Sequence, residues 1–164
     1  MKGVVDIEFM ISLFMFLVTI SFITYTIAGN LPRYHEEATV NHLRSVAFQA
    51  SELLLFDKGN PQDWQSESVI TDVNQIGLAA DKKYKIDSVK IAALNKYCTN
   101  EYDAIKNKII HDDALEMNLT ILYPPYAVHC APPSISETKN RVKIVRYAVV
   151  GLQIARIELT VMGS

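Results

Sequence analysis

The chain has 164 residues, of which 49% are hydrophobic, and its 16 lysines and arginines stand against 18 aspartates and glutamates. A net charge of −2, without any basic run, argues against a nucleic-acid-binding protein. Much of the hydrophobic content lies at the N-terminus, so the remainder has an ordinary soluble composition, enough for one globular domain.

The most hydrophobic stretch is residues 9–28, which contain no charged side chain. As an α-helix such a run is about 30 Å long, which matches the hydrocarbon core of a bilayer. Glu8 lies at its edge, and Gly3 lies five residues earlier. A later apolar stretch is interrupted by Arg146 and Arg156. The sequence therefore predicts a single anchor.

Three interpretations of this segment compete. A secretory signal peptide removed after Ala28 is disfavoured, because Asp6 and Glu8 outnumber the one lysine and the apolar run is too long. A simple transmembrane anchor explains the length but not Gly3 or Glu8. In the third interpretation, a prepilin segment, a peptidase removes only residues 1–3 and the apolar helix stays.

The residues KGVVDIEF, followed by an apolar run, resemble the class III signal peptide of archaeal type IV pilins and pilin-like proteins. The resemblance implies that a prepilin peptidase cleaves between Gly3 and Val4, which makes Glu8 the fifth residue of the mature chain. A carboxylate at the edge of an apolar core is costly unless it is paired. Glu8 is therefore expected to pair with the free α-amino group of a neighbouring subunit during assembly.

A helical pattern continues beyond the apolar run. Gly29 and Pro32 predict a kink or a local loosening, but the pattern then resumes. Apolar residues recur at steps of three and four, at Val40, Leu43, Ala47, Ala50 and Leu54. We expect one long helix from Val4 to Phe56, with an apolar first half (residues 4–28) and an amphipathic second half (residues 29–57).

The remainder, residues 58–164, is expected to form an extracellular head. It begins with Gly59, which is well placed to cap the long helix. The sequences GNPQDW and IGLA follow, and we expect Trp64 to anchor this loop in the core and Gly77 to form a turn. The two sequences also look like a recurring pair in the heads of archaeal pilin-like proteins, which extends the resemblance to about Leu94.

Two short helices are predicted next. Asp87 or Ser88 is a suitable cap for a helix that ends near Asn95, and Thr99 for a second one, which leaves Cys98 between them. The residues expected to face the core from these two helices are Val89, Ala92, Ala93, Tyr102, Ile105 and Ile109.

Apolar and polar residues alternate in residues 114–122 and 155–162, which predicts two strands, and residues 142–150, before Gly151, are expected to form a third. The expected core-facing residues of the first and last are Leu115, Met117, Leu119, Ile121, Ala155, Ile157, Leu159 and Val161. The proline-rich segment around Cys130 is expected to be a loop. These elements predict an α+β fold, in which a small antiparallel sheet and short helices pack on the long kinked helix, as in a type IV pilin.

The two cysteines, Cys98 and Cys130, are expected to pair. Lys2 marks the N-terminal side as cytoplasmic, so the head would lie in an oxidising space where disulfides form. The alternative is that both cysteines are small buried hydrophobic side chains.

Little in the sequence points to chemistry. Asn118-Leu119-Thr120 is a sequon on the polar face of a predicted strand, which makes Asn118 a candidate glycosylation site. The runs His35-Glu36-Glu37, His111-Asp112-Asp113 and His129-Cys130 lack the spacing of a metal site or of a nucleophile and its base. The sequence therefore predicts no enzyme, no metal and no cofactor.

These observations predict a structural subunit, a major or minor pilin, of an archaeal type IV pilus-like surface filament. The expected partners are other pilin subunits, a prepilin peptidase and, before assembly, membrane lipid, but no nucleic acid. The expected location is the cell membrane, with the head outside, and then the surface filament. The alternative is a single-pass surface protein that forms no filament and whose head is a binding or adhesion module.

Overall fold

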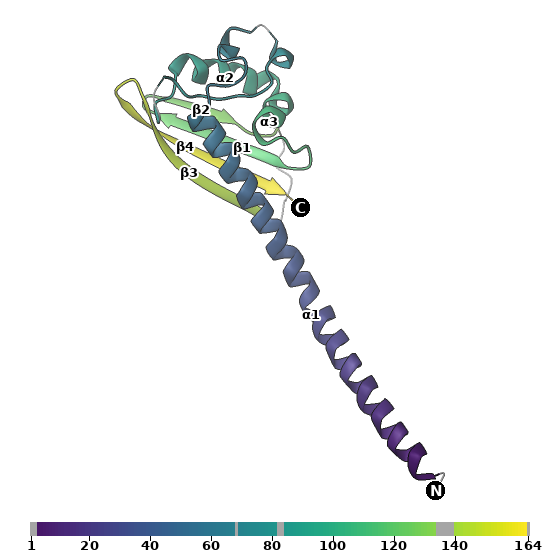
Figure 1. Ribbon diagram of the computed structural model, residues 1–164. Coiled ribbons are helices and arrows are strands. Elements are labelled where there is room, and N and C mark those ends of the chain that lie inside the picture. The colour runs from purple at the N-terminus through teal and green to yellow at the C-terminus, as the bar shows by residue number, and fades with distance from the viewer. Residues whose placement is uncertain (1–2, 68, 82–83, 134–139, 164) are drawn as a thin grey trace. The chain divides into compact units, whose positions relative to one another are not determined.

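The computed structural model describes residues 3–67, 69–81, 84–133 and 140–163. The chain divides into two compact units, Met1–Ala38 and Thr39–Ser164, and each is considered by itself. The fold is α+β, as predicted. Its elements (Figure 1) are α1 (Gly3–Phe56), the short 3-10 helices η1 (Trp64–Ser66) and η2 (Ile70–Asp72), α2 (Ser88–Asn100), α3 (Tyr102–Ile110), β1 (Glu116–Tyr123), β2 (Tyr126–Cys130), β3 (Asn140–Val150) and β4 (Gln153–Gly163).

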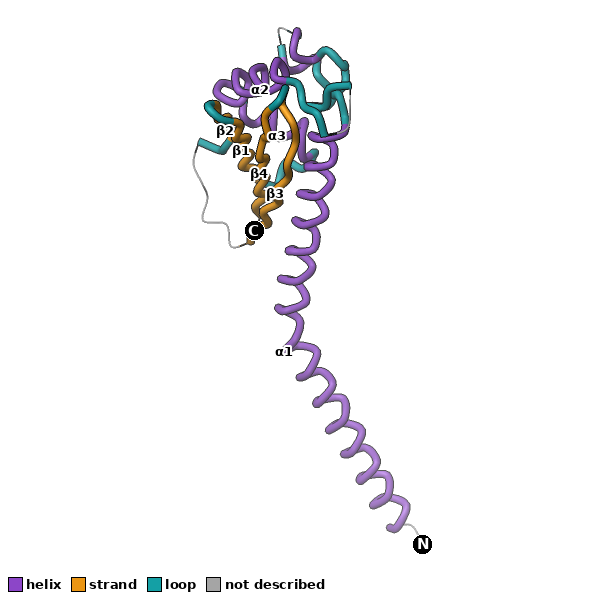
Figure 2. The backbone as a smooth tube through the Cα atoms, turned by 90° about the vertical axis from the view of Figure 1, so that its left-hand side faces the viewer, coloured by secondary structure: helices purple, strands orange, loops and turns teal. Residues whose placement is uncertain are grey.

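The helix α1 contains no break between Gly3 and Phe56. Figure 2 shows it as an uninterrupted coil, so Gly29 and Pro32 do not end the helix. Its last residue, Phe56, is the predicted one. Residues 39–56 belong to the second unit and cross one face of the sheet (Figure 1).

The four strands form one antiparallel sheet in the order β2-β1-β4-β3. Leu119 of β1 lies opposite both Cys130 of β2 and Leu159 of β4, so all three point to the same face. The strand β2 corrects the expected loop. Its core-facing residues are only Val128 and Cys130, with prolines on both sides, which is too short an alternation to predict a strand.

The core lies between the sheet and the amphipathic half of α1. The predicted inward residues of β1 and β4 are all buried. The stripe on α1 is confirmed as well, with Val40 half-buried and the rest buried, namely Leu43, Ala47, Ala50 and Leu54. The opposite face of the sheet carries polar residues such as Thr160 and Arg156 and has no helix of the described chain on it.

The helix α2 differs from the prediction in length and in its buried face. It continues to Asn100, so Cys98 lies inside it and not between two helices. Val89 is 60% exposed and Ala92 is exposed, because burial of Ile91 and other large side chains removes more apolar surface from water. The residues that α2 buries are Lys90, Ile91, Leu94, Tyr97 and Cys98.

The cap predicted at Thr99 is also wrong, because this hydroxyl donates to the carbonyl of Asn95 within α2. The following helix, α3, is preceded instead by Glu101, which makes no side-chain cap. The expected core residues of α3 are confirmed, since Tyr102, Ile105 and Ile109 are all buried.

Candidate functional site

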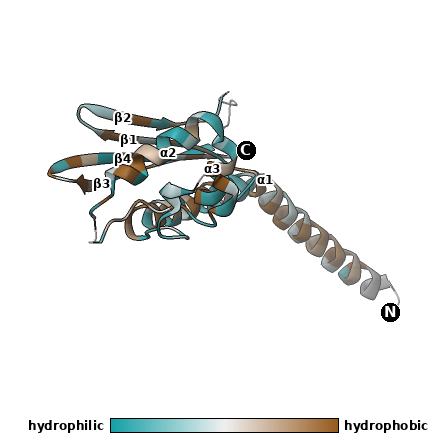
Figure 3. Cartoon of the chain, turned by 90° about the horizontal axis from the view of Figure 1, so that it is seen from above, coloured by the Kyte–Doolittle hydropathy of each residue, from teal (hydrophilic) through white to brown (hydrophobic). Residues whose placement is uncertain are grey.

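The most unusual surface of the molecule is the first half of α1. Every residue from 7 to 29 is exposed, and the large apolar side chains in this range are 41–80% exposed. Figure 3 colours most of this stretch as hydrophobic. Among the described helices, α1 is the one long and apolar enough to cross a membrane, judged by length and composition. Such a surface needs lipid or another apolar surface to cover it.

Two threonines in this half bond back to their own helix. Thr19 donates to the carbonyl of Met15 at 2.8 Å, and Thr26 donates to that of Phe22 at 2.9 Å. These hydroxyl groups are therefore satisfied without water, which is what a helix in an apolar environment requires. Glu8 is different, since it is exposed and makes no ion pair or hydrogen bond within the described chain.

The predicted processing site lies at the very start of α1. The backbones of Gly3 and Val4 are helical, whereas Met1 and Lys2 of the expected leader lie outside the described residues. Nothing in the described fold covers Glu8, so this carboxylate is available to a partner.

The second half of α1 ends in a structure formed by GNPQDW (residues 59–64) and IGLA (residues 76–79), which we call the clasp. The indole N–H of Trp64, which is fully buried, donates to the carbonyl of Gly77 at 2.8 Å. Gly59 has a φ of +89°, and a Cβ there would lie 2.5 Å from Cδ1 of Trp64. A side chain at position 59 would therefore clash with the buried indole, and the hydrogen bond from Trp64 to Gly77 joins the two segments.

The clasp also satisfies the end of α1. The last carbonyl groups of a helix have no partner within it. Leu78 donates its N–H to the carbonyl of Leu54 at 2.9 Å, and Ala79 donates to that of Asp57 at 3.0 Å. A Cβ on Gly77 would lie 2.6 Å from the carbonyl carbon of Asp57, so only glycine permits this approach.

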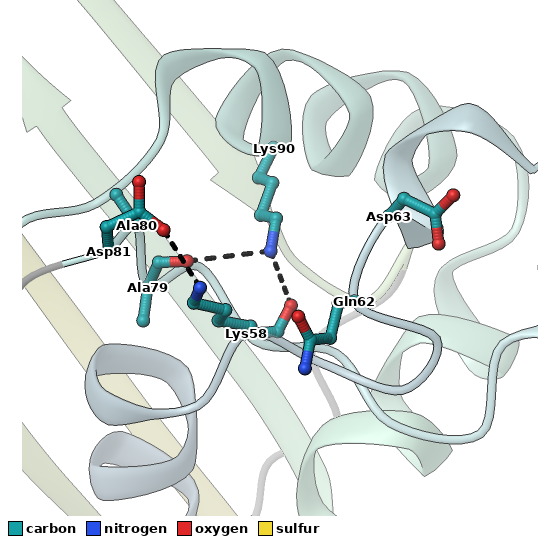
Figure 4. Close-up of a pocket in the computed structure, with 7 residues that line it drawn as sticks. All are labelled: Lys58, Gln62, Asp63, Ala79, Ala80, Asp81 and Lys90. Carbon is teal, nitrogen blue, oxygen red and sulfur yellow. Dashed lines mark hydrogen bonds and ion pairs between the residues drawn. The ribbon is translucent and has the colours of Figure 1, made fainter.

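A buried cation completes this junction (Figure 4). Lys90 of α2 is 4% exposed, and its ammonium donates to the carbonyls of Lys58 and Ala79 beside a cavity of about 250 Å³. Burial lowers the pKa of Lys90, and the carboxylate of Asp87 opposes that shift. Both bonds go to backbone oxygens, so Lys90 joins α2 to the clasp. Sequence reasoning missed it because a lysine is by default placed on the solvent side.

The other ammonium of the cavity is also engaged. Lys58 pairs with Asp81 at 2.9 Å, and this bond lowers the pKa of the Asp81 carboxyl group. Since both lysines already have oxygen partners, the arrangement suits a structural junction better than an anion site.

The two cysteines form the expected disulfide, which joins α2 to β2. The 32-residue separation between Cys98 and Cys130 encloses α3 and β1. Tyr102 adds a second connection inside this loop, because its hydroxyl donates to the carbonyl of Met117 at 2.7 Å and accepts the N–H of the same residue at 2.9 Å. Burial raises the pKa of Tyr102, so the phenol stays protonated.

The remaining candidate residues lie on the surface of the head. Asn118 is half-buried. It lies two residues from Thr120 on the open face of the sheet, which is the face on which a glycan acceptor would have to lie. In the described chain no group of three or more His, Cys, Asp or Glu side chains could hold a metal ion. His42 and Asp112 approach to 3.4 Å, which is a surface contact between α1 and the turn before β1.

No protein-family model matches the chain, and neither a curated protein nor a solved structure matches it.

Proposed function

We propose that the chain is a structural subunit, a major or minor pilin, of an archaeal type IV pilus-like surface filament. One observation carries this proposal. Residues 9–28 of α1 carry no charge and are exposed, and the same helix continues into residues that are buried in a disulfide-linked head. A simple anchor needs only the first property. A filament subunit needs both, since apolar helices share a core while heads face solvent.

In this proposal a prepilin peptidase removes residues 1–3 at the cytoplasmic face, and the mature chain begins at Val4. Membrane lipid covers the apolar half before assembly, and the helices of other subunits cover it afterwards. Glu8 then meets the α-amino group of a neighbouring subunit, which supplies the opposite charge that this carboxylate lacks within the described chain.

The N-terminal mass of the protein from its native host tests the processing step. The expected chain lacks Met1-Lys2-Gly3, whereas a start at Met1 or after Ala28 would contradict the proposal. Gly3→Leu should accumulate as an unprocessed precursor. Gly29→Leu is the matched control, because a Cβ at Gly29 meets nothing within 4 Å, and it should be processed normally.

The competing function is a monomeric surface module held by one anchor, which would also leave residues 7–29 exposed in the isolated chain. Immunogold electron microscopy of the native cells separates the two functions. We expect label along filaments. If the wild-type protein is never found in a filament, the anchored module is the correct description.

A further inference from the structure

The strand β3 lies at an edge of the sheet, and most of its outward backbone groups have no partner in the described chain. Val149 donates its N–H to the carbonyl of Tyr84 at 2.7 Å and accepts the N–H of Ile86 at 2.9 Å, so its backbone points away from β4. Backbone direction alternates along a strand. Four further residues therefore point outward in the same way: Arg141, Lys143, Val145 and Tyr147.

Charged side chains protect this edge only in part. Exposed edges usually carry charged side chains that discourage pairing with another strand. Two of the outward residues are charged, Arg141 and Lys143, but Lys143 is already paired with Glu158 of its own sheet, and Tyr147 is 62% exposed. A groove of about 240 Å³ runs beside the edge, and Phe56 and Tyr84 line it with ring centroids 5.0 Å apart.

We propose that β3 pairs with β3 of a second copy of this chain, antiparallel and about a two-fold axis at Ile144. The free run, residues 141–147, is centred on this residue. Its outward groups are therefore all satisfied when Arg141 lies opposite the partner's Tyr147 and Lys143 lies opposite the partner's Val145.

The side chains favour the same register. The four outward residues share the open face of the sheet, so Arg141 would lie over the exposed ring of the partner's Tyr147 as a cation–π pair. A shift of two residues in one direction would instead place Lys143 opposite the partner's Lys143, where like charges repel. A shift of two residues in the other direction would place Arg141 opposite the partner's Val149, whose outward backbone groups are already bonded to Tyr84 and Ile86. The register centred on Ile144 avoids both arrangements.

This contact goes beyond the filament and is independent of it. A two-fold interface is self-complementary and closes at two copies, so it cannot by itself build a filament. It would join two heads, either of anchored chains or of subunits in adjacent filaments. Filament formation and head pairing can therefore fail separately.

The test is the concentration dependence of the mass of the full chain in detergent micelles, measured by sedimentation. Val145→Pro removes an outward N–H and leaves the bonds from β3 to β4 in place. Ala127→Pro is the matched control, because its N–H points outward at the opposite edge, on β2. We expect wild type and Ala127→Pro to dimerise equally, and Val145→Pro at least tenfold more weakly.

A second variant covers the case in which proline disturbs the fold. Tyr147→Ala removes an exposed ring and should weaken the dimer by about tenfold, since each dimer contains the contact twice. Amide hydrogen exchange should also slow with protein concentration at Val145 and Tyr147, but not at Ala127.

Three results would overturn the proposal: a wild type that is monomeric throughout, equal association of wild type and Val145→Pro, or exchange that is independent of concentration. Association through α1 would give the second result, because neither proline lies in that helix. Under the proposed function, electron microscopy of cells that make Val145→Pro should show filaments as abundant as in wild type.

Discussion

Two leucines of α1 show how differently its halves are used. Leu17 is 53% exposed, whereas Leu54 is fully buried, although both lie in the same continuous helix. In the second half the described chain itself covers the apolar stripe with the sheet and the clasp. In the first half the described chain leaves the apolar side chains of residues 9–28 exposed. The buried half therefore contributes to the stability of the head, and the exposed half is available to lipid or to other chains.

The largest expected effect concerns the exposed half. Under the proposed function, Glu8→Ala leaves the neighbour's ammonium unpaired, at a cost on the order of 3–5 kcal/mol at each contact along the filament. Cells that make only this variant should contain processed, membrane-bound subunit and few or no filaments by electron microscopy. Glu37→Ala, outside the apolar run, should assemble normally. Filaments that form equally well without Glu8 would disprove its role.

The buried half gives the next largest effect. Leu54→Ala should lower the free energy of unfolding of the head by roughly 2–5 kcal/mol, because it leaves a cavity in the core. Leu17→Ala should leave that free energy unchanged. Trp64 is the one tryptophan of the chain and is fully buried in the head, so its fluorescence during denaturant unfolding measures both variants. Equal losses for the two leucines would contradict the division of α1 into an exposed half and a buried half.

The disulfide lies in the head alone, and the upper limit for the effect of its removal is smaller than that for the loss of a core leucine. Replacing Cys98 and Cys130 by serine opens a loop of 32 residues and should lower the free energy of unfolding by roughly 3–4 kcal/mol as an upper figure. The same fluorescence measurement checks this prediction. An unreduced protein that reacts with an alkylating reagent at either cysteine would contradict the disulfide itself.

Charge compensation should give the smallest effect. The ammonium of Lys143, and also Arg156 at 2.6 Å, hold the pKa of Glu158 below its ordinary value. These two ion pairs therefore stabilise the head at a pH above about 4.3, the pKa of glutamate in the unfolded chain. This contribution is lost as the pH falls through the lower pKa of Glu158 in the folded protein. Thermal unfolding between pH 7 and pH 3 should show a shallower loss for Glu158→Gln than for wild type. If the stability of wild type and that of Glu158→Gln fell in parallel with pH, the two ion pairs would contribute nothing to the stability of the head.

Long periodic patterns were sufficient to predict the main elements. The stripe from Leu43 to Leu54 and the alternation in β1 and β4 extend over enough residues to fix both the element and its buried face. The end of α1 at Phe56 followed from Gly59, whose positive φ the structure confirms. The disulfide followed from the expected compartment and not from any spacing.

Short or ambiguous patterns were not sufficient. The strand β2 has two core-facing residues, and its position depends on pairing with β1, which a single segment does not encode. In α2 two candidate faces exist, and the buried one contains Lys90, because its ammonium reaches backbone oxygens that only the folded clasp brings together. Sequence reasoning recognised both parts of the clasp but not that they bind each other through Trp64 and Gly77.

The clasp has a mechanical consequence. A tensile force between head and helix meets, at the end of α1, the Leu78–Leu54 and Ala79–Asp57 hydrogen bonds together with the ammonium of Lys90. The Leu78–Leu54 bond holds α1 itself, and the bonds to Asp57 and Lys58 hold the two residues that follow it, each to a segment distant in sequence. We therefore expect these bonds to break before the helix unravels from Phe56. Residues 7–29 have only the bonds of their own helix within the described chain, which can open one turn at a time. Under traction an isolated subunit should therefore unwind from its exposed half while the head stays folded.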